Sequence, residues 1–204
     1  MKVLVATRNP HKLAEIRAIF SDPAVTLLGA DELPGLPEVV EDGETLHANA
    51  VKKAVTLALA SGLWAMADDS GLEVEALGGE PGVRSARYAG EPVSYAANNR
   101  KLLRELAGAD NRAARFRCVI ALAGPSGRCR TVEGACPGRI AEVPMGDNGF
   151  GYDPLFIPDG YAETFAQMEG ALKNRLSHRG AALAAARREW SATLARGESD
   201  WPPD

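Results

Sequence analysis

Two adjacent aspartates directly follow a short apolar run in the first half of the chain. Residues 63–67 read Leu-Trp-Ala-Met-Ala, which predicts a buried strand, and Asp68, Asp69, Ser70 and Gly71 come next. In an α/β sheet ligands bind beyond the carboxyl ends of the strands, and successive side chains of a strand point to opposite faces. We therefore expect Asp68 and Asp69 to have different roles, and a divalent cation to keep one of them ionised. The same residues also suit a turn, because Asp and Ser bond their own backbone and Gly adopts positive φ.

A second group of candidate residues lies where the first predicted strand meets a helix. Residues 1–6 predict the strand, and residues 7–12 predict a tight passage into the helix, with Asn9 as its N-cap and Pro10 at its first position. Lys12 then falls in the first turn, where the helix dipole disfavours a cation unless an anion is bound. Free N–H groups at such a helix start suit a phosphate. A solvated surface lysine is the alternative, and the Walker A pattern is absent.

A helix predicted over residues 45–60 carries Asn49 and Lys53 four positions apart, and therefore on one face. Glu41 precedes this helix, at a place where backbone N–H groups favour a carboxylate. Asn49 and Lys53 could reach one pocket. The alternative for Glu41 is that it only stabilises the helix start.

Residues 149–156, Gly-Phe-Gly-Tyr-Asp-Pro-Leu-Phe, predict a loop that is dense in glycine and aromatic residues. Aromatic faces on such a loop suit stacking on a flat base, and the nearby Asp153 suits pairing with a ring N–H group. The alternative is a hydrophobic plug beneath the loop, which is the preferred interpretation for Phe156.

The last cluster of polar residues precedes an alanine-rich helix that is predicted to end near Arg196. Ser177 suits the N-cap of this helix, which leaves His178 and Arg179 in the first turn, where cations oppose the helix dipole. Lys173 lies just before them. Predicted helix starts in three parts of the chain thus carry or adjoin charge of a functional kind.

These residues need a scaffold in which strands and helices alternate. Further predicted elements are strands over residues 24–30, 72–77 and 138–143, a surface helix over 94–107, and an antiparallel hairpin of residues 114–123 and 128–136. The predicted fold class is therefore α/β, with a mixed central sheet flanked by helices. We expect one domain over residues 1–197 and a frayed tail over residues 198–204.

Composition and charge narrow the class of protein. The 204 residues are 46% hydrophobic and 25% charged with a formal net charge of −4, which is ordinary for a globular protein. Such a chain lacks the basic surface that polymeric nucleic acid needs, although a small anion can still bind locally. No apolar run approaches the roughly 20 residues that span a bilayer, and no signal-peptide pattern opens the chain, so we expect no membrane partner and a cytoplasmic location. The three cysteines have no metal-binding spacing.

Five segments of the chain, taken in order, resemble the inosine triphosphate pyrophosphatase family, which hydrolyses deaminated purine nucleoside triphosphates. The segments are residues 7–12, Glu41 with Asn49 and Lys53, residues 67–71, residues 150–153, and Lys173 with residues 177–179. They span the chain from residue 7 to residue 179, and their order makes the resemblance highly specific. One departure is Arg8, where the family often has glycine.

The resemblance implies a fold and a role for each matching position. It implies a mixed α/β sheet in two lobes with the active-site cleft between them, and a homodimer. Glu41 and Asp69 are the implied Mg²⁺ ligands, and Asp69 is also the implied catalytic base, with Asp68 supporting it. The implied substrate-binding residues are Thr7, Arg8, Asn9, Pro10, His11, Lys12, Lys53, Ser70, Phe150, Gly151, Tyr152, Asp153, Lys173, His178 and Arg179.

The expected activity is the hydrolysis of ITP, dITP or XTP to the nucleoside monophosphate and pyrophosphate. Phosphoryl transfer needs positioning and charge neutralisation, which the implied Mg²⁺ and lysines would provide. Two other functions stay open. One is a phosphatase that releases orthophosphate, although the Asp-x-Asp pattern of haloacid-dehalogenase phosphatases is absent at residues 68–70. The other is a nucleotide sensor without catalysis.

Overall fold

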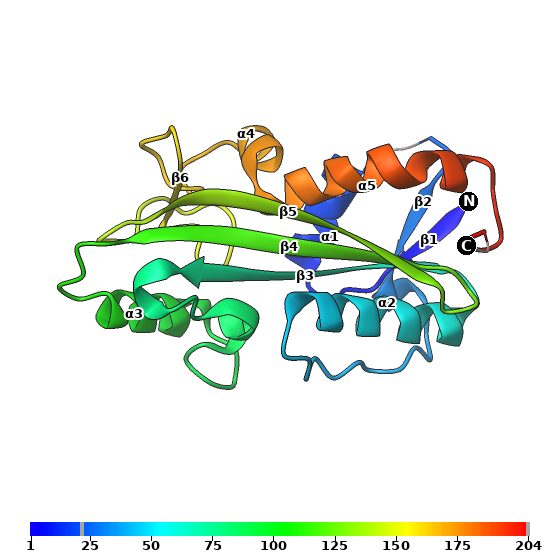
Figure 1. Ribbon diagram of the computed structural model, residues 1–204, viewed down its shortest axis with the longest axis horizontal. Helices are drawn as coiled ribbons and strands as arrows, with labels where there is room; N and C mark the ends of the chain where they lie inside the picture. The colour runs from blue at the N-terminus through cyan, green and yellow to red at the C-terminus, as the bar shows by residue number, and fades with distance from the viewer. Residues whose placement is uncertain (21–22, 203–204) are drawn as a thin grey trace. The chain divides into compact units, whose positions relative to one another are not determined.

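Six strands form one mixed sheet in the computed structural model, which describes residues 1–20 and 23–202 (Figure 1). In sequence order they are β1 (Lys2–Val5), β2 (Thr26–Gly29), β3 (Trp64–Val74), β4 (Ala113–Ala123), β5 (Cys129–Ile140) and β6 (Phe156–Pro158). Their order across the sheet is β2-β1-β3-β4-β5-β6. Strand β1 runs parallel to β2 and to β3, whereas β6 runs antiparallel to β5. This confirms the predicted mixed α/β fold.

Five α-helices and three short 3₁₀ helices accompany the strands within the described residues. They are α1 (Pro10–Ile19), α2 (Leu46–Ser61), α3 (Tyr95–Glu105), α4 (Gly170–Leu176) and α5 (His178–Ala195), with η1 (Ala30–Glu32), η2 (Glu75–Leu77) and η3 (Gly82–Arg87). Helix α2 shows how local sequence sets helix ends: the hydroxyl of Thr45 accepts from the N–H of Ala48 (3.0 Å), and Gly62 ends the helix at φ 67°. Of the helices in residues 1–20 and 23–202, none is both long and apolar enough to cross a membrane.

The acidic stretch lies inside a strand, which the sequence did not predict. Strand β3 continues through Asp68, Asp69, Ser70 and Gly71 to Val74, so both the expected strand end at the aspartates and the alternative of a turn there are wrong. The segment predicted as a separate strand, residues 72–77, is the end of β3 followed by η2. Charged residues stay in this strand because each of the two carboxylates meets a lysine from a helix, as described below.

The chain divides into two compact units. Unit 1 comprises Met1–Asp69, Cys118–Gly134 and Ala182–Asp204, and unit 2 comprises Ser70–Arg117 and Ala135–Ala181. The boundary along β3 therefore falls between Asp69 and Ser70, and each unit has an apolar core of its own. The single domain over residues 1–197 and the cleft between two lobes stay predictions.

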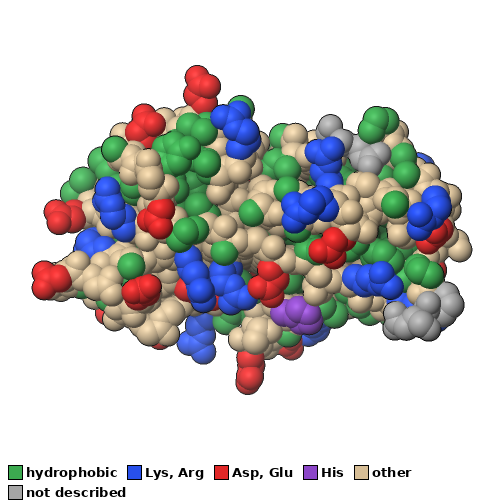
Figure 2. Space-filling view, turned by 45° about the horizontal axis from the view of Figure 1, so that its top comes forward, with side chains coloured by type: hydrophobic (Ala, Val, Ile, Leu, Met, Phe, Trp, Pro, Cys, Tyr) green, Lys and Arg blue, Asp and Glu red, His purple; other side chains and the backbone are tan. Residues whose placement is uncertain are grey.

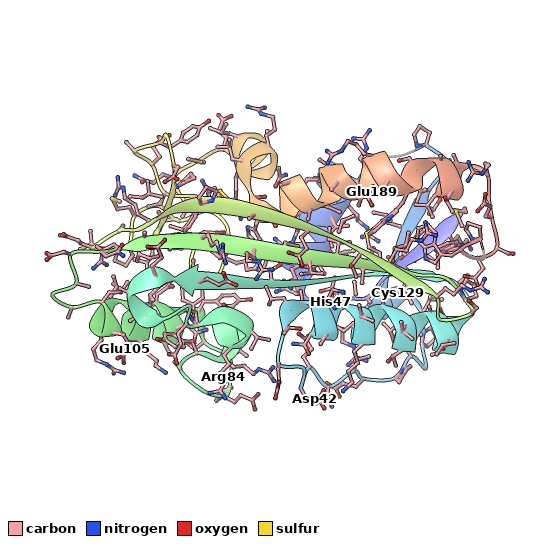
Figure 3. All side chains as sticks on the ribbon, viewed as in Figure 1. Asp42, His47, Arg84, Glu105, Cys129 and Glu189 are labelled. Carbon is pink, nitrogen blue, oxygen red and sulfur yellow. The ribbon has the colours of Figure 1, made fainter. Side chains whose placement is uncertain are left out.

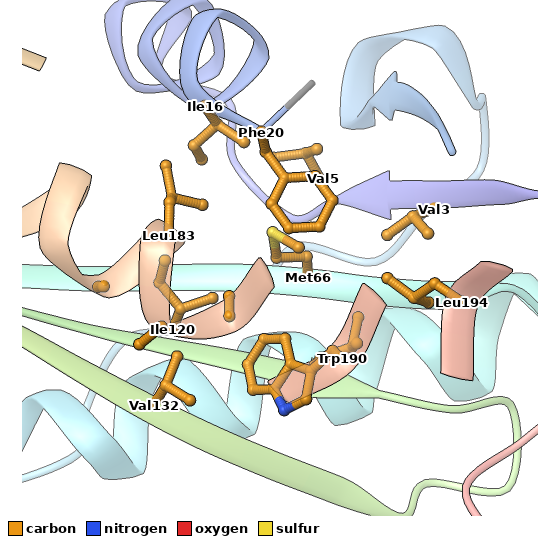
Figure 4. Close-up of a cluster of buried hydrophobic side chains, with 14 of the residues drawn as sticks. Val3, Val5, Ile16, Phe20, Met66, Ile120, Val132, Leu183, Trp190 and Leu194 are labelled. Carbon is orange, nitrogen blue, oxygen red and sulfur yellow. The ribbon is translucent and has the colours of Figure 1, made fainter. Parts of the chain in front are cut away.

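The core of unit 1 depends on the alternation of side chains along its strands. Val3, Val5 and Met66 point to the face that packs against Ile16 of α1 and Leu183 of α5 (Figure 4). On the opposite side of the strands lies α2 (Figure 1). The buried residues of α2 include the alanines at positions 50, 54 and 58, and small side chains permit a close approach of helix and sheet.

The core of unit 2 is built around aromatic rings. Phe116 lies 4.6 Å from Phe156, measured between ring centroids, and 6.1 Å from Phe165. Phe156 is fully buried, which confirms its interpretation as a hydrophobic plug beneath the loop. Leu102 and Leu106 from the α3 segment belong to the same cluster. The segment predicted as a surface helix thus contributes to the core of unit 2.

Residues 198–201 pack within unit 1, so the prediction of a frayed tail is wrong for them. Trp201 is 3% exposed, donates from Nε1 to the carbonyl of Leu122 (3.0 Å), and lies 5.0 Å from the ring of Trp64. The Trp64 indole in turn donates to the carbonyl of Glu198 (2.9 Å). Buried tryptophans with satisfied N–H groups anchor this segment. Residues 203–204 lie outside the described part of the chain.

We expect Trp201→Phe to lower the free energy of unfolding by about 1 kcal/mol, because the carbonyl of Leu122 loses its buried donor. Guanidinium unfolding followed by tryptophan fluorescence measures this difference. Pro202→Ala is the control, since Pro202 is exposed beside it. Equal unfolding midpoints for Trp201→Phe and the wild type would show that the hydrogen bond from Trp201 to Leu122 does not contribute to stability.

Acidic and basic side chains are interspersed on the face shown in Figure 2. This distribution agrees with the formal net charge of −4. The residues that could bind a charged ligand must therefore be sought in local arrangements, which follow.

Candidate active site

The passage from β1 to α1 has the local structure that the sequence predicts. The side chain of Asn9 caps the helix, with its Oδ1 accepting from the N–H groups of His11 (3.0 Å) and Lys12 (3.3 Å). Thr7 Oγ1 accepts from the N–H of Asn9 (3.1 Å). Two of the N–H groups that were expected to hold a phosphate are thus bonded to Asn9. The phosphate-binding role of residues 7–12 stays a prediction that depends on the basic side chains.

Lys12 reaches from α1 to the first aspartate of β3. Its Nζ lies 3.1 Å from Asp68 Oδ2, and the side chain of Asp68 is 1% exposed. Arg8 has a different environment, because it is exposed and lies 3.8 Å from Glu38. Pro10 and His11 are also exposed, so Lys12 is the member of this turn that joins the buried acids.

Lys53 reaches from α2 to the second aspartate. Its Nζ donates to the carbonyl of Asp68 (2.7 Å) and lies 3.5 Å from Asp69 Oδ1 and 3.2 Å from Glu41 Oε2. The carboxylates of Asp68 and Asp69 therefore have different lysine partners from different helices, as the alternation of side chains along a strand allows. That the two aspartates have different roles stays a prediction. Glu41 and Asp69, distant in sequence, both contact one ammonium group.

The loop that carries Glu41 is fixed to α2. Asn49, which is 1% exposed, accepts through Oδ1 from the N–H of Gly43 (2.8 Å). A Cβ atom at Gly43 would lie 2.6 Å from that oxygen, so any larger residue would displace the side chain of Asn49. On the surface, Lys52 pairs at 2.6 Å with Asp42, which Figure 3 labels below α2. Asn49 thus anchors the loop, whereas Lys53 contacts Glu41 itself.

Asp69 has the electrostatic character of a general base. Burial raises its pKa, the ammonium groups of Lys53 and Lys12 oppose this rise, and the carboxylates of Glu41 and Asp68 add to it. The net effect is a raised pKa. A carboxylate whose pKa moves towards neutral pH accepts a proton more effectively. The buried Oδ2 of Asp69 accepts no hydrogen bond from the residues that the structure describes.

The carboxylates of Glu41 and Asp69 fit the donor chemistry of Mg²⁺. Among the described residues, no group of three or more His, Cys, Asp or Glu side chains is arranged to hold a metal ion. Mg²⁺ is commonly held by one or two carboxylates together with substrate phosphates and water. Glu41 and Asp69, with the buried Oδ2 of Asp69 still available as an acceptor, meet that requirement.

The glycine-rich loop of unit 2 is closed by Asp153. Its Oδ2 accepts from the N–H of Phe150 (2.8 Å) and from Lys173 Nζ (2.7 Å), and both charged side chains are buried. A Cβ atom at Gly149 would lie 2.1 Å from Asp153 Oδ2, so glycine is required there. Asp153 was expected to pair with a base, but in this structure its Oδ2 holds the loop and Lys173 in place.

Two basic side chains lie close to the ring of Phe150. Lys173 Nζ lies 5.2 Å and Arg179 Cζ 5.8 Å from its centroid. Arg179 also donates from Nη2 to Ser70 Oγ (3.2 Å). These four residues of unit 2 were predicted as substrate-binding residues from separate motifs, and the structure brings them together. Their binding role stays a prediction.

His178 and Arg179 are positioned by a tight junction between α4 and α5. Ser177 Oγ accepts from the N–H of Gly180 (3.0 Å), and a Cβ atom at Gly180 would lie only 1.8 Å from the carbonyl oxygen of Asn174. The imidazole of His178 stacks on Phe116, with a centroid distance of 4.6 Å and an interplanar angle of 12°. The predicted helix start at Ser177 is confirmed, with a further short helix before it.

Tyr152 differs from the other predicted site residues because it points into the core of unit 2. It is 4% exposed and its hydroxyl donates to the carbonyl of Ser85 (2.9 Å). The structure gives it an anchoring role, and its contact with substrate stays a prediction. Sequence reasoning also missed Tyr95 and Asn99, which contact the loop from α3. No short motif marks these two residues.

The fold and the site define a mixed α/β protein with an acid and lysine centre in one unit and an aromatic, cationic cluster in the other. The sequence model described as the Ham1 family matches residues 3–189 of the chain. The chain therefore belongs to the Ham1 family.

The chain is similar to named proteins and to solved structures over most of its length. The chain is 51% identical over 185 residues to a dITP/XTP pyrophosphatase of Desulforamulus reducens, covering 90% of this chain and 92% of that protein. It is equally identical to a dITP/XTP pyrophosphatase of Geobacter sulfurreducens, with 90% and 93% covered. The solved Ham1 protein of Staphylococcus aureus is 39% identical, with a TM-score of 0.85 over 95% of this chain and 100% of that chain. These findings confirm the resemblance inferred from the motifs.

Proposed function

We propose that this protein hydrolyses the deaminated purine nucleoside triphosphates ITP, dITP and XTP to the nucleoside monophosphate and pyrophosphate, and so removes them from the nucleotide pool. The single observation that carries the proposal is that Glu41 and Asp69 meet on the ammonium of Lys53, beside the Lys12 and Asp68 pair. The names of relatives at 51% identity support the choice of substrate class.

Asp69 is the proposed general base. Its raised pKa and buried position suit removal of a proton from a water molecule as the water oxygen bonds to the α-phosphorus. The bond from the α-phosphorus to the bridging oxygen then breaks, and pyrophosphate departs with that oxygen. The proton of the water resides on Asp69 until it is lost to solvent, so the carboxylate is regenerated.

Lysine side chains provide the charge that the triphosphate needs. Lys12 would bind phosphate oxygens, and Lys53 would keep Glu41 and Asp69 in place while it balances their charge. We propose that Glu41 and Asp69 also hold Mg²⁺. When bound, this ion neutralises phosphate charge and makes a bound water more acidic.

The base would be recognised by the cluster around Phe150. The ring offers an apolar face for stacking, and Lys173 and Arg179 bring donors that suit the 6-oxo acceptor of a deaminated purine. Adenine places an amino donor at that position, which would leave those cations facing another donor. Unpaired polar groups of this kind reject a substrate more strongly than small differences in apolar contact do.

A panel of nucleoside triphosphates incubated with Mg²⁺ tests the proposed function. We expect nucleoside monophosphate and pyrophosphate from ITP, dITP and XTP, and kcat/KM for ATP lower by about a hundredfold or more. Release of orthophosphate would instead identify a phosphatase. Tight binding of ITP without turnover would identify a sensor, and either result would overturn the proposal.

The proposal also includes a homodimeric state and a cytoplasmic location. The implied homodimer is tested by analytical ultracentrifugation of the purified protein, where a species of 21.6 kDa alone would contradict it. The cytoplasmic location is tested by cell fractionation. Burial raises the pKa of Cys129 and of Cys136 to about 11, so both thiols stay protonated at neutral pH.

A further inference from the structure

Helix α3 contacts the loop of residues 149–153 through two side chains that the proposed site does not include. Asn99 donates from Nδ2 to the carbonyl of Gly151 (3.0 Å). The ring of Tyr95 lies 6.0 Å from the ring of Phe150, tilted by 46°. Tyr95 and Asn99 are four positions apart and therefore share one face of α3. That face offers the loop an amide donor and an aromatic ring.

Helix α3 is itself held firmly by a buried polar network. Asn98, which is 1% exposed, donates to the carbonyl groups of Ser85 (3.3 Å) and Ala86 (2.9 Å) and accepts from the N–H of Ala89 (2.7 Å). At the start of the helix, Ser94 Oγ accepts from the N–H of Ala97 (3.3 Å). Fully satisfied buried networks rigidify the elements that they join. Contacts from α3 can therefore define where the loop lies.

The hydrogen bond from Asn99 acts next to the ring that is proposed to stack on the base. Gly151 follows Phe150 directly and adopts φ 65°, a conformation that favours glycine and makes the loop turn sharply. Fixing the carbonyl of Gly151 fixes the peptide plane that follows it, and Tyr95 limits the ring of Phe150 from the side. The buried Oδ1 of Asn99 accepts no hydrogen bond from the described residues. The amide of Asn99 therefore acts on the loop through its Nδ2, which donates to the carbonyl of Gly151.

We propose that Asn99, together with Tyr95, is a positioning residue that holds Phe150 in the orientation needed to stack on the purine base. The inference rests on the proposed function. It assigns to α3 a part in base recognition, through Phe150 and the loop, without direct contact between Asn99 and the substrate.

Steady-state kinetics of Asn99→Ala and Asn99→Asp with ITP test the proposal. Alanine removes the donor, and aspartate keeps the size of the side chain but places a buried carboxylate beside the carbonyl of Gly151. The loss of one partly buried hydrogen bond corresponds to about a tenfold change in an equilibrium constant. We therefore expect KM for ITP to rise about tenfold or more in both variants, with kcat changed by less than about threefold.

Two further measurements separate positioning from general damage. Inhibition by inorganic tripolyphosphate, which has no base, should keep its inhibition constant in both Asn99 variants. In a Phe150→Ala background, Asn99→Ala should add no further increase in KM, because the group through which Asn99 acts is gone. Arg100→Ala, an exposed neighbour on the same helix, is the control and should match the wild type.

Three results would overturn the proposal for Asn99. A KM for ITP within about twofold of the wild type in both Asn99 variants would overturn the proposal, as would additive effects of Asn99→Ala and Phe150→Ala. A parallel rise in the inhibition constant of tripolyphosphate would show a general structural role and would also overturn it. If the wild-type protein releases no monophosphate from ITP, the proposed function is wrong. The wild type alone shows this, so that failure is distinct from a failure of the Asn99 variants to change KM.

Discussion

Replacing Asp69 by asparagine is expected to lower kcat with ITP by about a thousandfold, because the amide cannot accept the proton of the attacking water. The amide also removes one of the two carboxylates proposed to hold Mg²⁺. Asp69 is buried and contacts Lys53, so an isosteric side chain preserves the packing around it. Release of pyrophosphate by the purified variant, at saturating substrate and Mg²⁺, measures the loss.

The same variant should be no less stable than the wild type. Burial raises the pKa of Asp69, so its ionised form is less favourable in the folded chain than in the unfolded chain. This cost is fully present above the folded pKa and disappears as the pH falls below the unfolded pKa. Without metal, thermal unfolding of Asp69→Asn near neutral pH should therefore give an equal or higher Tm, and the difference should shrink towards about pH 4.

Asp68→Asn is the matched control for Asp69→Asn. Asp68 is the adjacent residue, but it faces α1 and pairs with Lys12. We expect its effect on kcat to be smaller than that of Asp69→Asn by about tenfold or more. Near-normal turnover by Asp69→Asn, or equal losses in the two variants, would remove Asp69 from its role as the base.

Replacing Lys12 by alanine is expected to lower kcat/KM for ITP by about a hundredfold, through loss of a charge that binds the triphosphate. The side chain of Lys12 is 17% exposed, and reduced solvent screening strengthens the attraction of its charge for phosphate. Part of the loss should appear in KM, since the charge acts on bound substrate as well as on the transition state.

A double variant separates this role from a structural one. Lys12→Ala deprives the buried carboxylate of Asp68 of a contact at 3.1 Å, which would cost about 3 kcal/mol of stability. Adding Asp68→Asn removes the buried charge, so the double variant should regain much of that stability while kcat/KM stays low. If the double variant regains activity as well, or if Lys12→Ala leaves both KM and kcat unchanged, Lys12 serves only the fold.

Local sequence was sufficient to predict several elements of this fold. Asn9 was predicted as an N-cap and a helix was predicted to begin near residue 45, because helix starts depend on contacts within a few residues. The structure shows the side chains of Asn9 and Thr45 both accepting hydrogen bonds from the first turn. The hairpin joined at residues 124–127 was predicted for the same reason. In this turn the N–H of Gly127 donates to the carbonyl of Gly124, and the N–H of Gly124 donates to the carbonyl of Arg128.

The main errors concern segments whose conformation depends on distant parts of the chain. Residues 68–71 have the composition of a turn, yet they continue β3, because Lys12 and Lys53 arrive from two helices and compensate the buried charges. Residues 198–202 have the composition of a tail. They pack against unit 1 because Trp201 finds both an apolar surface and a carbonyl acceptor at Leu122.

The alternation of Asp68 and Asp69 between faces, the capped helix starts and the motifs that place the chain in its family can all be read from the sequence, because they depend on neighbouring residues and on residue type. The contacts of Glu41 and Asp69 with the ammonium of Lys53, and of Asn99 with the carbonyl of Gly151, became visible only in the folded chain. Such contacts join residues that are far apart along the chain. They form when packed helices and strands bring side chains within hydrogen-bonding distance, and no local pattern specifies that distance.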